Sequence, residues 1–115
     1  MEKLAECLKA LSDPTRLRII RLLENGELCV CDLMEALDLP QSKVSRHMSF
    51  LKNSGWVVGT RKGKWVYYRL AEIEDPVQSR VLDVLHDELQ KFPQAVEDFQ
   101  RLNCFLKTKK ADSCQ

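Results

Sequence analysis

The first half of the chain carries apolar residues at intervals of three and four, the period of an amphipathic helix. Asp13 and Pro14 predict a helix start, because aspartate caps helix N-termini and proline suits the first helical position. Asn25-Gly26 and Asp38-Leu39-Pro40 interrupt the later segments. The pattern predicts four helices, over about residues 1–11, 15–24, 29–37 and 41–53.

After Ser54-Gly55 the period changes from that of a helix to that of a strand. Two β-branched and aromatic runs, residues 56–60 and 65–70, flank Arg61-Lys62-Gly63-Lys64 and predict a hairpin. Alternation along the second run predicts one face toward the core and one toward solvent. The core face holds Val66, Tyr68 and Leu70, and the solvent face holds Trp65, Tyr67 and Arg69.

The last third of the chain returns to helical spacing, with Pro93 expected to end or kink its first helix. Two apolar stripes run along it: Val77, Val81, Leu85 and Leu89, then Phe92, Val96, Phe99, Leu102 and Leu106. Residues 1–11 and 76–106 hold more apolar side chains than one small domain covers, so we expect them to form a homodimer interface. Packing onto their own domain is the alternative. Residues 107–115 are expected to be a flexible tail.

The order of these elements predicts a mainly α-helical fold with a small β-hairpin. Residues 29–53 form two short helices joined by a tight turn, the helix-turn-helix pattern, whose second helix enters the DNA major groove. A basic hairpin over residues 56–70 that follows such a pair is a wing. We therefore expect residues 1–115 to be a single winged helix-turn-helix domain.

Charge is distributed very unevenly along the chain. The net charge is +1, yet residues 39–71 contain no acidic residue and carry a formal +7, which leaves −6 on the remainder. A polycationic module on an acidic protein predicts binding to double-stranded DNA. Arg46 is suited to guanine and Gln41 to adenine, with phosphate contacts as the alternative. The predicted DNA-binding residues are Gln41, Ser42, Lys43, Ser45, Arg46, His47, Arg61, Lys62 and Lys64.

Composition limits where the protein acts. No apolar run is long enough to span a membrane, and the charged N-terminus does not fit a secretory signal. Five cysteines, an odd number, favour the reducing cytoplasm over a disulfide framework.

Cys29 and Cys31, at the predicted start of the third helix, are the candidate ligands. Thiolates prefer soft, thiophilic ions, and the unpaired N–H groups of a helix start favour thiolates. On an ideal helix, residues two apart point about 200° away from each other, so one ion could join both sulfurs only if the first turn unwound. The alternative is that one or both cysteines are small buried apolar residues.

Three segments together are similar to the ArsR/SmtB family of metal-responsive repressors, over roughly residues 4–72. They are Ala10-Leu11-Ser12-Asp13-Pro14-Thr15-Arg16-Leu17-Arg18-Ile19, Val44-Ser45-Arg46-His47, and Gly63-Lys64-Trp65-Val66-Tyr67-Tyr68-Arg69-Leu70. The resemblance implies a homodimer that binds operator DNA and leaves it when the ion binds.

Within that family, Glu27-Leu28-Cys29-Val30-Cys31-Asp32-Leu33 is similar to the arsenic-sensing branch. This likeness implies that arsenite or antimonite, in the trivalent state, is the inducer. The branch has a third cysteine where this chain has Met34, so the third ligand stays open among Cys7, Cys104 and Cys114. The family's zinc site needs Asp-x-His, which Asp83-Val84-Leu85-His86 does not provide.

Two other functions remain as alternatives. A related branch that senses cadmium or lead pairs the same Cys-Val-Cys with N-terminal cysteines, a role open to Cys7. A thiol redox protein would use Cys29 and Cys31, but a one-residue spacing makes a strained disulfide. No phosphate loop or acid/base constellation supports an enzyme.

Overall fold

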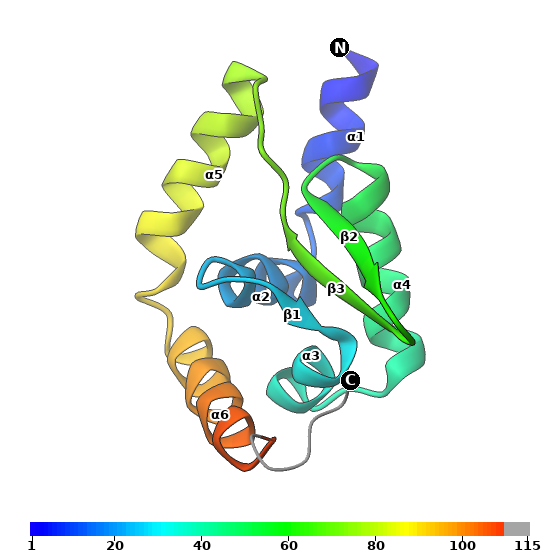
Figure 1. Ribbon diagram of the computed structural model, residues 1–115. Coiled ribbons are helices and arrows are strands. Elements are labelled where there is room, and N and C mark those ends of the chain that lie inside the picture. Colours follow the sequence, from blue (N-terminus) through cyan, green and yellow to red (C-terminus); the bar gives the residue numbers. More distant parts are fainter. Residues whose placement is uncertain (110–115) are drawn as a thin grey trace.

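The computed structural model describes residues 1–109 and is mainly helical, with one small sheet (Figure 1). None of the helices in this range is long and apolar enough to cross a bilayer. The elements are α1 (Glu2–Ala10), α2 (Pro14–Leu23), β1 (Leu28–Cys29), α3 (Val30–Leu37), α4 (Gln41–Asn53), β2 (Val57–Lys62), β3 (Trp65–Leu70), α5 (Pro76–Leu89) and α6 (Pro93–Lys109).

The predicted helix starts and stops are confirmed where the sequence carries a local signal. The Asp13 carboxylate accepts hydrogen bonds from the backbone N–H groups of Thr15 and Arg16, with Pro14 at the first helical position. Asp75 and Pro76 start α5 in the same way. α5 ends at Leu89 and Pro93 begins α6, so the chain changes direction between them.

The sheet has the strand order β1-β3-β2, with both pairings antiparallel. The hairpin closes between Lys62 and Trp65, and Gly63 adopts φ +64° in its turn, a region that favours glycine. Strand β1 was not predicted, because a two-residue strand has no sequence period of its own. Consequently the third helix begins at Val30, and Cys29 belongs to the sheet.

The core lies between α2, α3, α4 and the start of the hairpin. Its largest fully buried side chain, Trp56, donates a hydrogen bond from Nε1 to the Cys7 carbonyl and so fixes α1 to the base of β2. Met48 and Leu51 of α4 are fully buried and belong to this core. This core holds α3 and α4 in the arrangement of a helix-turn-helix.

The division of β3 into a core face and a solvent face is only partly correct. Arg69 is exposed and Tyr68 and Leu70 pack against the core, but Trp65 and Tyr67 are half-buried. Tyr67 of β3 is paired with Cys29 of β1, and side chains of directly paired residues lie on the same face of the sheet. Pairing with β1 therefore partly buries side chains of β3, such as Tyr67, that a two-stranded wing would leave exposed.

α6 differs from its prediction in length and in its buried face. Residues 107–109, expected in a flexible tail, are helical up to Lys109, whose side chain contacts α3. The remaining tail, with Cys114, lies outside the described residues. Three residues of the predicted apolar stripe, Phe92, Val96 and Leu106, are exposed in the single chain, as residues of a dimer interface would be. The buried residues of α6 are Ala95, Asp98 and Leu102.

Candidate ligand site and nucleic-acid interface

Cys29 is the N-cap of α3 and is completely buried. Its sulfur accepts from the backbone N–H of Asp32, while the Asp32 carboxylate accepts from the backbone N–H of Cys29 at 2.9 Å. This reciprocal arrangement is a capping box, with cysteine in the place that serine or threonine usually takes. The same sulfur that is a candidate ligand therefore also supports the first turn of α3.

A lysine from the far end of the chain completes this cluster. Lys109 Nζ donates to Asp32 Oδ1 at 2.6 Å and to Cys29 Sγ at 3.4 Å. Burial lowers the pKa of Lys109, but the hydrogen bond and charge of Asp32, with Cys29, outweigh it and raise the pKa. Lys109 is accordingly a largely buried ammonium ion, 13% exposed, that Asp32 and Cys29 hold.

Cys31 is half-buried and is the second residue of α3. Since Cys29 lies in extended backbone ahead of the helix, with φ −88° and ψ 170°, the separation of about 200° expected on one helix does not apply to this pair. Within residues 1–109 no group of three or more His, Cys, Asp or Glu side chains is arranged to hold a metal ion. The described residues thus supply two neighbouring thiols without a third.

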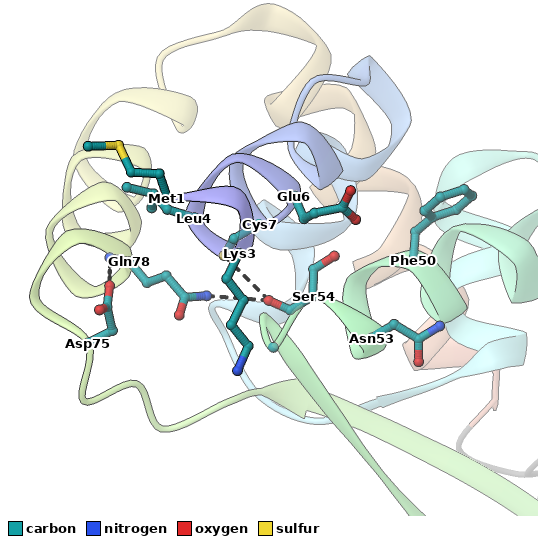
Figure 2. Close-up of a pocket in the computed structure, with 11 residues that line it drawn as sticks. Met1, Lys3, Leu4, Glu6, Cys7, Phe50, Asn53, Ser54, Asp75 and Gln78 are labelled. Carbon is teal, nitrogen blue, oxygen red and sulfur yellow. Dashed lines mark hydrogen bonds between the residues drawn. The ribbon is translucent and has the colours of Figure 1, made fainter.

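Cys7 lies away from this pair. It lines a cavity of about 860 Å³ between α1, the end of α4 and the start of α5, shown in Figure 2. Its thiol donates to the Ser54 carbonyl at 3.4 Å, which also accepts from the Gln78 amide. Burial, with a smaller contribution from Asp75, raises the pKa of the Cys7 thiol. Figure 1 shows α1 in the upper part of the molecule and α3 in the lower part, and within residues 1–109 Cys7 forms no metal-holding group with Cys29 and Cys31.

The other possible third ligands differ in position. Cys104 is exposed, and a helix places it about 200° around α6 from the buried Leu102. It therefore points away from α3, against which α6 packs. Met34 is half-buried and packs against the core.

The predicted DNA-reading residues lie in the first two turns of α4. Gln41, Ser42, Lys43 and Arg46 are exposed. Ser45 is half-buried, as is His47, whose Nδ1 lies 3.3 Å from Arg16 Nη1 on α2. His47 is thus directed to a neighbouring helix. Burial is the main reason that the pKa of His47 is lowered.

The wing presents Arg61, Lys62 and Lys64, all exposed, around its turn. Lys62 also forms an ion pair with Glu27 at 2.7 Å, and its ammonium lies 4.9 Å from the centre of the Tyr67 ring. Glu27 comes two residues before Cys29, and Tyr67 is paired with Cys29 in the sheet. The wing and the candidate ligand site are therefore in direct contact.

Four contributing residues were not singled out from the sequence: Glu27, Asp32, Lys109 and Arg16. A local signal existed for Asp32 alone, because an acidic residue three positions after an N-cap is typical of a capping box. The partners of Glu27, Lys109 and Arg16 lie 35, 77 and 31 residues away, so no local pattern identifies them.

Comparison with known proteins agrees with this geometry. The profile of the bacterial regulatory protein, arsR family, matches residues 13–57. The arsenical resistance operon repressor of Escherichia coli is 44% identical over 98 residues, 84% of each chain. The arsenic resistance transcriptional regulator ArsR2 of Pseudomonas putida is 44% identical over 91 residues, 78% of this chain and 76% of the relative.

A solved structure extends the likeness to the whole fold. The homodimeric winged helix-turn-helix DNA-binding domain from Mycobacterium bovis, a possible ArsR-family regulator, superposes with a TM-score of 0.64 at 30% identity, covering 80% of this chain and 86% of that one. The predicted winged helix-turn-helix is confirmed. The chain belongs to the arsR family of bacterial regulatory proteins, and is a DNA-binding transcription regulator rather than an enzyme.

Proposed function

We propose that this protein is an arsenic-responsive repressor: it binds operator DNA as a homodimer and dissociates when Cys29 and Cys31 bind trivalent arsenic or antimony. The observation that carries the proposal is the double role of Cys29. It caps α3, and its backbone pairs with Tyr67 of the wing. A regulator that needs reduced thiols and operator DNA acts in the cytoplasm.

Binding of arsenous acid to the two thiols needs no oxidant or reductant. Two As–O bonds break and two As–S bonds form, and each thiol proton leaves with a hydroxide as water. One hydroxide stays on arsenic unless a third thiol replaces it and releases a third water. Soft thiolate sulfur suits this thiophilic element better than the carboxylate of Asp32 does.

The proposed link to DNA runs through the elements that flank Cys29. When its sulfur bonds to arsenic, it becomes a weaker and differently oriented acceptor for the N–H of Asp32, so the cap on the first turn of α3 is weakened. α3 supports α4, and β1 supports the wing. One ligand thus disturbs both elements that we assign to DNA: α4 with Gln41, Ser42, Lys43, Ser45, Arg46 and His47, and the wing with Arg61, Lys62 and Lys64.

Exposed apolar side chains on the terminal helices support the homodimer. α5 has no fully buried residue, although Val81, Leu85 and Leu89 pack against the core. Large apolar side chains left exposed on α1, α5, α6 and the link between the last two are Leu8, Val77, Val84, Phe92, Val96 and Leu106. Such a surface is typical of a protein–protein interface. We assign residues 1–11 and 76–106 to it.

The direct test measures operator binding with and without arsenite for single cysteine variants. Cys29→Ser and Cys31→Ser should bind operator as tightly as the wild type yet fail to release it. Cys104→Ser, an exposed thiol on the opposite side of α6, is the matched control and should respond normally. Normal release by either Cys29→Ser or Cys31→Ser would overturn the proposal.

For the third ligand we favour Cys114 of the same chain. It follows Lys109 by five residues, and five residues span up to about 17 Å when extended. Lys109 itself contacts the Cys29 sulfur, so this reach includes the site. X-ray absorption on the arsenite complex should count three sulfurs in the wild type and two in Cys114→Ser. Two sulfurs in both proteins would instead leave hydroxide as the third ligand.

A further inference from the structure

α6 holds the candidate sensor helix α3 at both ends. At the C-terminal end of α3, the Arg101 guanidinium donates to the Glu35 carbonyl at 3.2 Å and lies 3.7 Å from the Asp38 carboxylate. At the N-terminal end, Lys109 contacts Cys29 and Asp32. Leu102 lies buried seven residues before Lys109, two turns earlier on the same face of α6. The two cations therefore bracket α3 around a shared apolar contact.

The two ends differ in what ligand binding would do to them. Arg101 is bound to a backbone carbonyl and an exposed carboxylate, neither of which is a candidate ligand. Lys109 contacts the sulfur of Cys29, with its own side chain 13% exposed and that of Asp32 4% exposed. Buried lysines are rare unless paired, so this ammonium depends on its two partners. A change in the bonding of the Cys29 sulfur must therefore alter the surroundings of the Lys109 ammonium.

We propose that Lys109 is a positioning residue that stabilises the ligand-free sensor, and that its hydrogen bond to the Cys29 sulfur breaks when that sulfur binds arsenic. The inference rests on the proposed function. A sulfur bonded to both carbon and arsenic shares one of its lone pairs with arsenic, so it is a poorer acceptor for the ammonium than the unbound sulfur. The ion pair with Asp32 remains. The contacts at the C-terminal end of α6 thereby differ between the ligand-free and the arsenite-bound protein. The strength of the hydrogen bond between Lys109 and the Cys29 sulfur sets how much arsenite is needed to release the operator.

The first test follows the backbone amide resonances of the ¹⁵N-labelled full-length Cys114→Ser protein during an arsenite titration, so that a bond between Cys114 and arsenic cannot itself move the end of α6. We expect the resonances of Val30, Thr108 and Lys109 to shift together, and none of them to shift in Cys29→Ser. If Val30 shifts while Thr108 and Lys109 stay in place, the inference on Lys109 is wrong and the proposed function stands. If no resonance shifts, both are wrong. This test needs no substitution at Lys109.

The second test compares the arsenite concentration that releases half of the operator DNA. Lys109→Met should lower this concentration by about 3- to 10-fold, since only the ligand-free state loses a hydrogen bond to sulfur. Lys109→Arg keeps the positive charge and should stay near the wild type. Lys107→Met, at an exposed position of the same helix, is the control. Operator affinity without arsenite is measured for all four proteins, and each half-release concentration is compared relative to it, so that a general loss of stability in Lys109→Met is separated from the loss of the hydrogen bond to sulfur. An unchanged or raised half-release concentration in Lys109→Met would refute the inference.

Discussion

The ion pair between Glu27 and Lys62 makes a quantitative prediction about DNA affinity. Lys62 is a predicted phosphate-binding residue, and in the free protein its ammonium is 2.7 Å from the Glu27 carboxylate. The two side chains are 55% and 30% exposed, so the pair is worth only about 0.2–1 kcal/mol. DNA must compete with Glu27 for this cation. Glu27→Gln removes the competitor, and with two copies in a dimer the affinity should rise by about 2- to 30-fold.

The assay is fluorescence anisotropy of a labelled operator at several salt concentrations, because salt screens exposed ion pairs. The gain in Glu27→Gln should shrink as salt rises. Glu35→Gln, which changes the charge equally on the exposed side of α3, is the control. Lys62→Ala should weaken binding to every sequence and reduce the salt slope by about 0.9 for each phosphate that the protein no longer neutralises. In the Lys62→Ala background, Glu27→Gln should have no more effect than Glu35→Gln does. An equal gain with and without Lys62 would refute the reasoning.

Three further outcomes are expected. The pKa of His47 is lowered in the folded protein, so the unfolded chain takes up the proton first as the pH falls. The free energy of unfolding should therefore decrease below about pH 6.5. Urea unfolding between about pH 7.5 and 5.5 should show this decrease in the wild type, and His47→Gln should lack the part that His47 contributes. Arg18→Ala should lower the free energy of unfolding by about 3–5 kcal/mol, as chemical denaturation can measure, because it leaves the Asp98 carboxylate, 1% exposed, without its cation. Asp98→Asn should lower it less, because the Arg18 side chain that loses its partner is 26% exposed. In the Cys114→Ser background, Met34→Cys should tighten arsenite binding by restoring a third thiol, whereas Met34→Ala in the wild type should leave it nearly unchanged, as calorimetry can measure.

The helices and the wing could be predicted from the sequence because each carries a local signal. Asp13 with Pro14 and Asp75 with Pro76 are adjacent residues whose capping chemistry does not depend on the rest of the chain. The alternation after Gly55 likewise reflects one hairpin with a two-residue turn. Such features follow from the preferences of neighbouring residues, which act before any tertiary contact forms.

The contacts that organise the candidate site could not be predicted in this way. Strand β1 exists only because Leu28 and Cys29 pair with β3, about 40 residues later. The buried face of α6 includes a charged residue, Asp98, because Arg18 on α2 satisfies both carboxylate oxygens at 2.9 Å. Part of the apolar stripe on α6, Val96 and Leu106, is thus exposed while a carboxylate is buried. Hydrophobic periodicity does not identify such a buried carboxylate, because the arginine that pairs with it comes from a distant part of the chain.

The position of Cys29 suggests why a thiol pair can control DNA binding in so small a protein. A helix N-cap contributes about 0.5–2 kcal/mol to stability, and coupling between two sites in regulatory proteins is typically about 1–3 kcal/mol. In the proposed mechanism, arsenic bonds directly to the sulfur that caps α3. The free energy of the cap therefore contributes to the coupling between arsenite binding and DNA binding without any intermediate residue. The same sulfur lies next to the wing through the pairing of Cys29 with Tyr67, and next to α6 through Lys109. A ligand bound later on α3, beyond Asp32, would compete with none of these contacts, and therefore the cysteine at the cap is the residue on which we expect the response to depend most strongly.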